Sequence, residues 1–116
     1  MTALANRRSD VEPAMPASAC TSMSDVRREI DRVDRALVRL LSERLTYIER
    51  AGVIKQDRNR VRDEARIQDV LDKVAAACAA EDFPFTIAEP VWRALMEGCI
   101  AHEFVVWDAT NAPERS

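Results

Sequence analysis

The sequence predicts an all-α domain of three helices whose first helix is too long for the domain to cover by itself. The 116 residues are 47% apolar and include only two glycines, a composition typical of one small helical domain. Residues 25 to about 54 contain no proline and a glycine only at Gly52, and their apolar side chains recur with the spacing of one buried helical face. These side chains are Val26, Ile30, Val33, Leu37, Leu40, Leu41, Leu45 and Ile48. A helix of this length measures ~50 Å, so we expect a second copy of the chain to cover it in a homodimer.

Three cations are spaced along this first helix. At ~100° and ~1.5 Å per residue, Arg44 and Lys55 lie about three turns apart and roughly 20° apart around the axis, so both can reach one ligand. Arg27 lies ~25 Å from Arg44 and about 100° further round, so it would serve a second copy of the site in a dimer. The alternative is that all three are solvated cations in surface ion pairs that contribute little.

Two further helices follow the first. The polar residues 56–62 predict a turn between antiparallel helices. A second helix is expected over residues 63–80, with apolar residues at helical spacing and two acids at its start. Thr86 and Glu89 then form the pattern of a capping box, with a proline still in the first turn. A third helix is therefore predicted over residues 86–107.

The third helix carries an acid in line with apolar side chains. Trp92, Met96, Cys99 and Glu103 fall within about 60° of one another on a helical wheel. A carboxyl group on such a face is either at its edge and turned to water, or buried in the protonated form that donates a hydrogen bond. His102, the only histidine, points elsewhere on the wheel, so a nucleophilic Cys/His or Ser/His/Asp set is not supported.

The two ends of the chain lack helical periodicity. Residues 1–21 mix Ala, Ser, Pro and charged side chains, and they are predicted to be a disordered N-terminal tail. The helical domain is expected over residues 22–108, with Ser22 or Ser24 as the cap of its first helix. Residues 109–116 form the predicted C-terminal tail.

Composition and charge argue against several classes of function. A net charge of -3 and a pI near 5.2 disfavour nucleic acid or an anionic membrane as the main partner. The three cysteines show neither a disulfide framework nor metal-ligand spacing, so we expect reduced thiols, no metal and no cofactor. No apolar run has the length of a membrane span or the form of a signal peptide, so the expected location is the cytoplasm.

Taken together, the motifs resemble the all-helical chorismate mutases, whose fold the isochorismate-pyruvate lyases share. The resemblance rests on the segments DVRREIDRVD (25–34), LLSER (40–44) and VRDEAR (61–66), on Lys55, and on Glu103 in the third helix. It covers residues 24 to 108, nearly the whole expected domain. It implies an intertwined homodimer of three-helix protomers, with two equivalent sites between the long first helices.

The resemblance also implies roles for the cations and for one acid. Arg27 from one protomer and Arg44 from the other would hold the two carboxylates of chorismate, the small-molecule substrate. Arg66 would add positive charge near them. Lys55 would contact a carboxylate and the ether oxygen, and Asp63 would hold the ring hydroxyl.

On the third helix, the resemblance places Glu103 near the ether oxygen, and Cys99, about one turn earlier, is counted among the substrate-binding residues. Two positions depart from the family's pattern. Many bacterial members have a glutamate where this chain has Ile67, and its loss weakens recognition of the hydroxyl. Many have a glutamine where this chain has Glu103, although some members also use glutamate there.

The implied activity is that of a chorismate mutase, the isomerase that rearranges chorismate to prephenate for phenylalanine and tyrosine synthesis. This pericyclic reaction needs no nucleophile, because the protein has only to select the compact diaxial conformer and stabilise the charge that grows on the ether oxygen. Arginines suit the two carboxylates, lysine suits the ether oxygen, and Glu103 helps only when protonated. The alternatives are an isochorismate-pyruvate lyase, which forms salicylate, and a noncatalytic helical dimerisation module.

Overall fold

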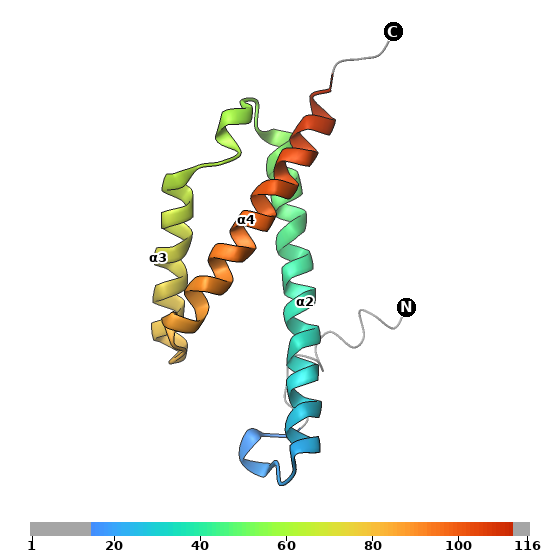
Figure 1. Ribbon diagram of the computed structural model, residues 1–116, viewed down its shortest axis with the longest axis vertical. Helices are drawn as coiled ribbons and strands as arrows, with labels where there is room; N and C mark the ends of the chain where they lie inside the picture. Colours follow the sequence, from blue (N-terminus) through green and yellow to red (C-terminus); the bar gives the residue numbers. More distant parts are fainter. Residues whose placement is uncertain (1–14, 113–116) are drawn as a thin grey trace. The chain divides into compact units, whose positions relative to one another are not determined.

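The structure is a computed structural model in which residues 15–112 are described. They form three α-helices, α2 (Met23–Ile54), α3 (Glu64–Glu81) and α4 (Phe85–Thr110), and two short 3-10 helices, η1 (Ala17–Ala19) and η2 (Arg58–Arg60) (Figure 1). Over the same residues there is no β-strand, and no helix is long and apolar enough to cross a membrane. The predicted all-α class and the long first helix are therefore confirmed. Packing divides the chain into two compact units, Met1–Arg44 and Leu45–Ser116.

In the first unit, local hydrogen bonds fix the beginning of α2. Ser22 Oγ accepts a hydrogen bond from the backbone N–H of Asp25 at 3.1 Å, so Ser22 caps the helix. The Thr21 N–H donates to the Asp25 carboxylate at 3.1 Å, which holds the pKa of Asp25 below its ordinary value. Residues 15–21, which the sequence assigned to the tail, thus contain η1 and a turn that leads into the helix. The rest of the expected tail, residues 1–14, lies outside the described residues.

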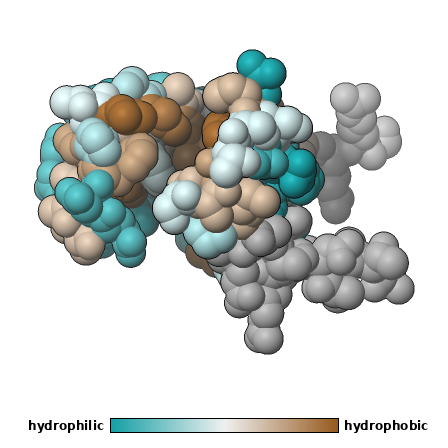
Figure 2. Space-filling view, turned by 90° about the horizontal axis from the view of Figure 1, so that it is seen from below, coloured by the Kyte–Doolittle hydropathy of each residue, from teal (hydrophilic) through white to brown (hydrophobic). Residues whose placement is uncertain are grey.

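The apolar stripe of α2 is largely exposed in the first unit. Ile30 and Leu37 each expose 51% of their surface, and five more large apolar residues of α2 in this unit are exposed: Met23, Val33, Val38, Leu40 and Leu41. Seen from below in Figure 2, the surface of the molecule as a whole mixes apolar side chains, in brown, with hydrophilic ones, in teal. An apolar face of this extent on a helix is typical of an interaction surface.

In the second unit, α3 and α4 pack against each other after a sharp reversal of the chain (Figure 1). Asp63 caps α3, because its carboxylate accepts a hydrogen bond from the Arg66 N–H at 3.1 Å. At the other end, Asp82 adopts the left-handed conformation (φ 56°) and its N–H donates to the last carbonyls of the helix. The core between the two helices contains Leu71, Cys78, Ala88, Met96 and Cys99.

The start of α4 corrects one detail of the prediction. The helix begins at Phe85 with Pro84 as its N-cap, and no side chain caps it, so the capping box expected at Thr86 was wrong. Instead, the Pro84 carbonyl accepts hydrogen bonds from the N–H groups of Ile87 (3.1 Å) and Ala88 (3.3 Å). This start places Ala88 in the core at 2% exposure. Pro90 consequently lies inside the helix, beyond the first turn.

Candidate active site

The second unit brings two predicted site residues, Lys55 and Glu103, into contact. Lys55 directly follows α2, and Glu103 lies in the second half of α4. Lys55 Nζ lies 2.6 Å from Glu103 Oε2, in a charge-assisted hydrogen bond. The Glu103 side chain is 5% exposed, whereas that of Lys55 is 30% exposed. Glu103 is therefore buried rather than turned to water at the edge of its stripe, and Lys55 connects it to the surface.

This pair can offer hydrogen-bond donors to an anionic ligand. An ammonium group carries three donors, and Glu103 takes one of them, so Lys55 keeps donors for a ligand oxygen. The buried carboxyl group can in turn donate to an oxygen only when it is protonated. Cys99 lies one helical turn before Glu103 on α4 and is buried, as the shared stripe predicted.

Two features that the sequence analysis did not single out as functional hold this pair in place. Trp107, one turn after Glu103, donates its indole N–H to the carbonyl oxygen of Lys55 at 3.0 Å. At Gly52, α2 passes α4 so closely that a Cβ would lie 3.3 Å from Glu103 Cγ. The i, i+4 spacing of Glu103 and Trp107, and the single glycine in the first helix, were the signals available for these two residues.

The segment after Lys55 is tied to α4 by two arginines. Arg58 forms two hydrogen bonds with the Asp108 carboxylate (2.8 and 3.2 Å), and its guanidinium lies 4.5 Å from the centre of the Phe104 ring. Arg62 likewise forms two hydrogen bonds with Glu97 (3.0 and 2.9 Å). The pKa values of both carboxyl groups lie below the ordinary range because these guanidinium groups donate to them.

A third contact links the end of α2 to α4. His102 Nε2 lies 2.7 Å from Glu49 Oε2, and both side chains are partly exposed. His102 thus contacts a carboxylate. Within residues 15–112, no group of His, Cys, Asp and Glu is arranged to hold a metal ion.

Two other predicted site residues in this unit have structural partners. Arg66 is exposed on the first turn of α3, where Nη1 lies 2.5 Å from Asp69 Oδ2. The Asp63 carboxylate is the N-cap of α3, as described above. Contact of either residue with a substrate therefore stays a prediction.

Arg27 and Arg44 belong to the first unit. Arg27 is exposed on α2, and Arg44 is half-buried. Their convergence with Lys55 on one ligand stays a prediction.

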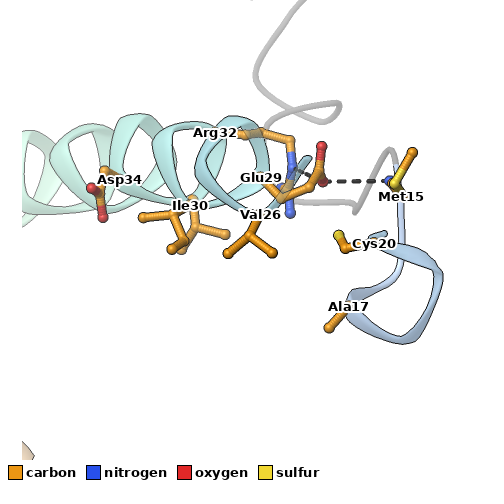
Figure 3. A pocket seen from close by; sticks show the side chains of 9 residues that line it. Met15, Ala17, Cys20, Val26, Glu29, Ile30, Arg32 and Asp34 are labelled. Carbon is orange, nitrogen blue, oxygen red and sulfur yellow. Dashed lines mark hydrogen bonds and ion pairs between the residues drawn. The ribbon is translucent and has the colours of Figure 1, made fainter. Parts of the chain in front are cut away.

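The first unit also contains a cavity of about 360 Å³, drawn in Figure 3. Within it, Glu29 accepts hydrogen bonds from Arg32 Nε (3.1 Å) and from the Met15 N–H (3.4 Å). The lining is mainly apolar and includes none of the seven predicted site residues. It consists of Met15, Ala17, Cys20, Val26, Glu29, Ile30, Arg32, Val33 and Asp34.

Comparison with known proteins supplies the family. The family model described as chorismate mutase type II matches residues 26–104, a range that contains all seven predicted site residues. A similar protein is the isochorismate pyruvate lyase from Pseudomonas aeruginosa. It is 24% identical over 92 residues, which cover 79% of this chain and 91% of the lyase. The chain therefore belongs to the chorismate mutase type II family.

Proposed function

We propose that the chain is a chorismate mutase, which rearranges chorismate to prephenate without a cofactor. The observation that carries the proposal is the contact between the buried Glu103 and Lys55, 2.6 Å apart, in a member of this family. In the reaction a C–O bond breaks as a C–C bond forms, and negative charge grows on the ether oxygen. Cationic and protonated donors held in a largely dry site stabilise that charge without reorganisation.

Each partner of the pair has a distinct part in this chemistry. Lys55 donates to the ether oxygen and to a substrate carboxylate through the donors that Glu103 leaves available. Glu103 donates to the same ether oxygen in its protonated form, because an ionised carboxylate would repel the growing charge.

The proposal includes a homodimer with shared sites. The exposed apolar stripe of α2, which includes Ile30 and Leu37, supports a second copy of the chain as its cover. In that dimer, Arg44 and Lys55 would act together with Arg27 of the partner subunit, and the two arginines would bind the substrate's two carboxylates. The product would enter phenylalanine and tyrosine synthesis.

The second candidate function is an isochorismate-pyruvate lyase, which forms salicylate and pyruvate. The similarity to the lyase from Pseudomonas aeruginosa favours it. So does Ile67, a half-buried apolar residue on α3 at the position where many mutases use a glutamate for the ring hydroxyl. A noncatalytic dimerisation module is disfavoured by the buried acid, which an interaction surface does not require.

Incubation of the purified chain with chorismate and, separately, with isochorismate tests these alternatives. Prephenate from chorismate as the main product supports the mutase, salicylate from isochorismate supports the lyase, and neither product supports the module. Lys55→Met should abolish the turnover that is found, because it removes the cation while keeping a long side chain. Lys73→Met, on the exposed face of α3, is the matched control and should leave turnover unchanged.

A further inference from the structure

After Glu103, the last turns of α4 bind the segment that follows α2. The Trp107 indole N–H donates to the carbonyl of Lys55 at 3.0 Å. The Asp108 carboxylate binds Arg58, which is three residues after Lys55. The Trp107 contact is partly buried, whereas both members of the Arg58–Asp108 pair are more than half exposed. The indole contact is therefore the better shielded of the two and the less sensitive to salt.

The carbonyl that Trp107 binds belongs to the end of a helix. Lys55 lies just after Ile54, the last residue of α2, so its carbonyl has no partner in a following helical turn. Its N–H is still bound to the helix, because it donates to the Ala51 carbonyl at 3.0 Å. The main chain of Lys55 is consequently held on one side by α2 and on the other by the indole.

The same helix supplies both the anchor of Lys55 and its ionic partner. Glu103 and Trp107 are four residues apart on α4 and therefore face the same way. Glu103 binds the ammonium at the tip of the Lys55 side chain, and Trp107 binds its backbone. Because α4 is rigid over one turn, these two contacts together fix where the ammonium lies.

We infer that Trp107 is a positioning residue, whose hydrogen bond to the Lys55 carbonyl places the Lys55 ammonium for reaction. The inference rests on the proposed function, because the placement matters to turnover only if Lys55 acts on the substrate. Loss of the indole N–H leaves the carbonyl without its partner and lets the end of α2 shift. Displacement of a reacting group by about 1 Å can lower the rate by roughly 10²-fold.

The test replaces Trp107 by phenylalanine in the full chain, which keeps an aromatic ring and removes the N–H. We expect kcat to fall by about tenfold to 10²-fold with a much smaller change in KM, while circular dichroism keeps the helical spectrum. Trp92→Phe is the matched control, because Trp92 is half-buried on the same helix and contacts neither Lys55 nor Glu103 through a hydrogen bond. A Trp107→Phe enzyme with wild-type kcat, or with only its stability or KM changed, overturns the inference.

A second readout does not depend on turnover. The chain has two lysines, Lys55 and Lys73, and nitrogen NMR detects an ammonium group when an ion pair slows its proton exchange. Trp107→Phe should weaken the Lys55 signal and leave that of Lys73, which pairs with Asp69, unchanged. If the wild-type chain converts neither chorismate nor isochorismate, the proposed function fails. The NMR measurement still shows whether the Trp107 hydrogen bond positions the Lys55 ammonium. An unchanged Lys55 signal in Trp107→Phe overturns the positioning role.

Discussion

Gly52 lies so close to Glu103 that a Cβ at residue 52 would be 3.2 Å from the Glu103 carbonyl oxygen and 3.1 Å from Val106 Cγ1. Both distances are shorter than ordinary van der Waals contacts, and one of the two atoms belongs to the backbone of α4, which cannot rotate away. The absence of a side chain at Gly52 thus sets the separation of α2 and α4 where the candidate acid is carried.

Gly52→Ala should therefore destabilise the protein and lower its activity. Overpacking costs about 1–3 kcal/mol, which outweighs the gain of up to ~1 kcal/mol in helix propensity from Gly to Ala. Because the displaced backbone belongs to Glu103, we expect turnover to fall as well. Denaturant unfolding and steady-state kinetics measure the two effects.

Gly98→Ala is the matched control on α4. Apart from its chain neighbours and the nearby backbone of α4 itself, no described atom lies within 4 Å of the position its Cβ would take, and its φ is not positive. This substitution should stabilise the chain by about 0.5–1 kcal/mol and leave turnover unchanged. If Gly52→Ala behaves in the same way, the close approach does not constrain Glu103.

The ion pairs of α4 predict a loss of stability in acid. Arg62 holds the pKa of Glu97 below its ordinary value of 4.5. A carboxyl group whose pKa is lower in the folded state contributes stability above its unfolded pKa, and this contribution is lost as pH falls through the folded value. A double-mutant cycle of Arg62→Gln and Glu97→Gln measures the coupling free energy between the two side chains. At pH 7 this coupling should favour the folded state, and salt should reduce it because the pair is exposed. Well below pH 4.5 the coupling should vanish. A coupling that persists in acid would show that the ion pair is not its source.

The sequence predicted the features that depend on local pattern. The period of the apolar residues located all three helices, and Ser22 was one of two predicted caps. The burial of Cys99 on the apolar stripe of α4 was also predicted, whereas for Glu103 the stripe left burial and a position at its edge both open. The capping box at Thr86 failed because α4 begins at Phe85 after Pro84, so Thr86 already lies inside the helix.

Contacts between distant segments did not follow from the residue pattern. The resemblance placed Lys55 and Glu103, which are 48 positions apart, at one ether oxygen, but their direct ion pair was not predicted. Nor was the contact of Trp107 with Lys55, which joins residues 52 positions apart. Helical periodicity shows which face of α4 is buried, but it does not show which segment lies against that face. The ion pair of Arg66 with Asp69 was not predicted for a different reason, because any of several nearby acids could have bound Arg66.

The proposed shared site predicts complementation between two inactive variants. If Arg27 of the partner subunit completes each site, Arg27→Ala and Arg44→Ala should each be nearly inactive, because each removes one carboxylate ligand from both sites. In a heterodimer of the two, one site has both arginines and the other has neither. Mixing and refolding the variants should therefore restore part of the activity. No recovery in heterodimers purified through two different affinity tags would rule out the shared site.

Glu103 gives the sharpest prediction about the chemistry. Its proposed catalytic role is to donate a hydrogen bond to the ether oxygen, although in the free enzyme it contacts Lys55. Glu103→Gln keeps a hydrogen-bond donor, so this variant should retain activity. Glu103→Ala should lose on the order of 10²-fold or more in kcat, as for the deletion of an oxyanion donor. Glu97→Gln, which changes an exposed acid on the same helix, serves as the control and should keep the wild-type kcat. A fully active Glu103→Ala variant would show that the buried carboxyl group takes no part in the reaction.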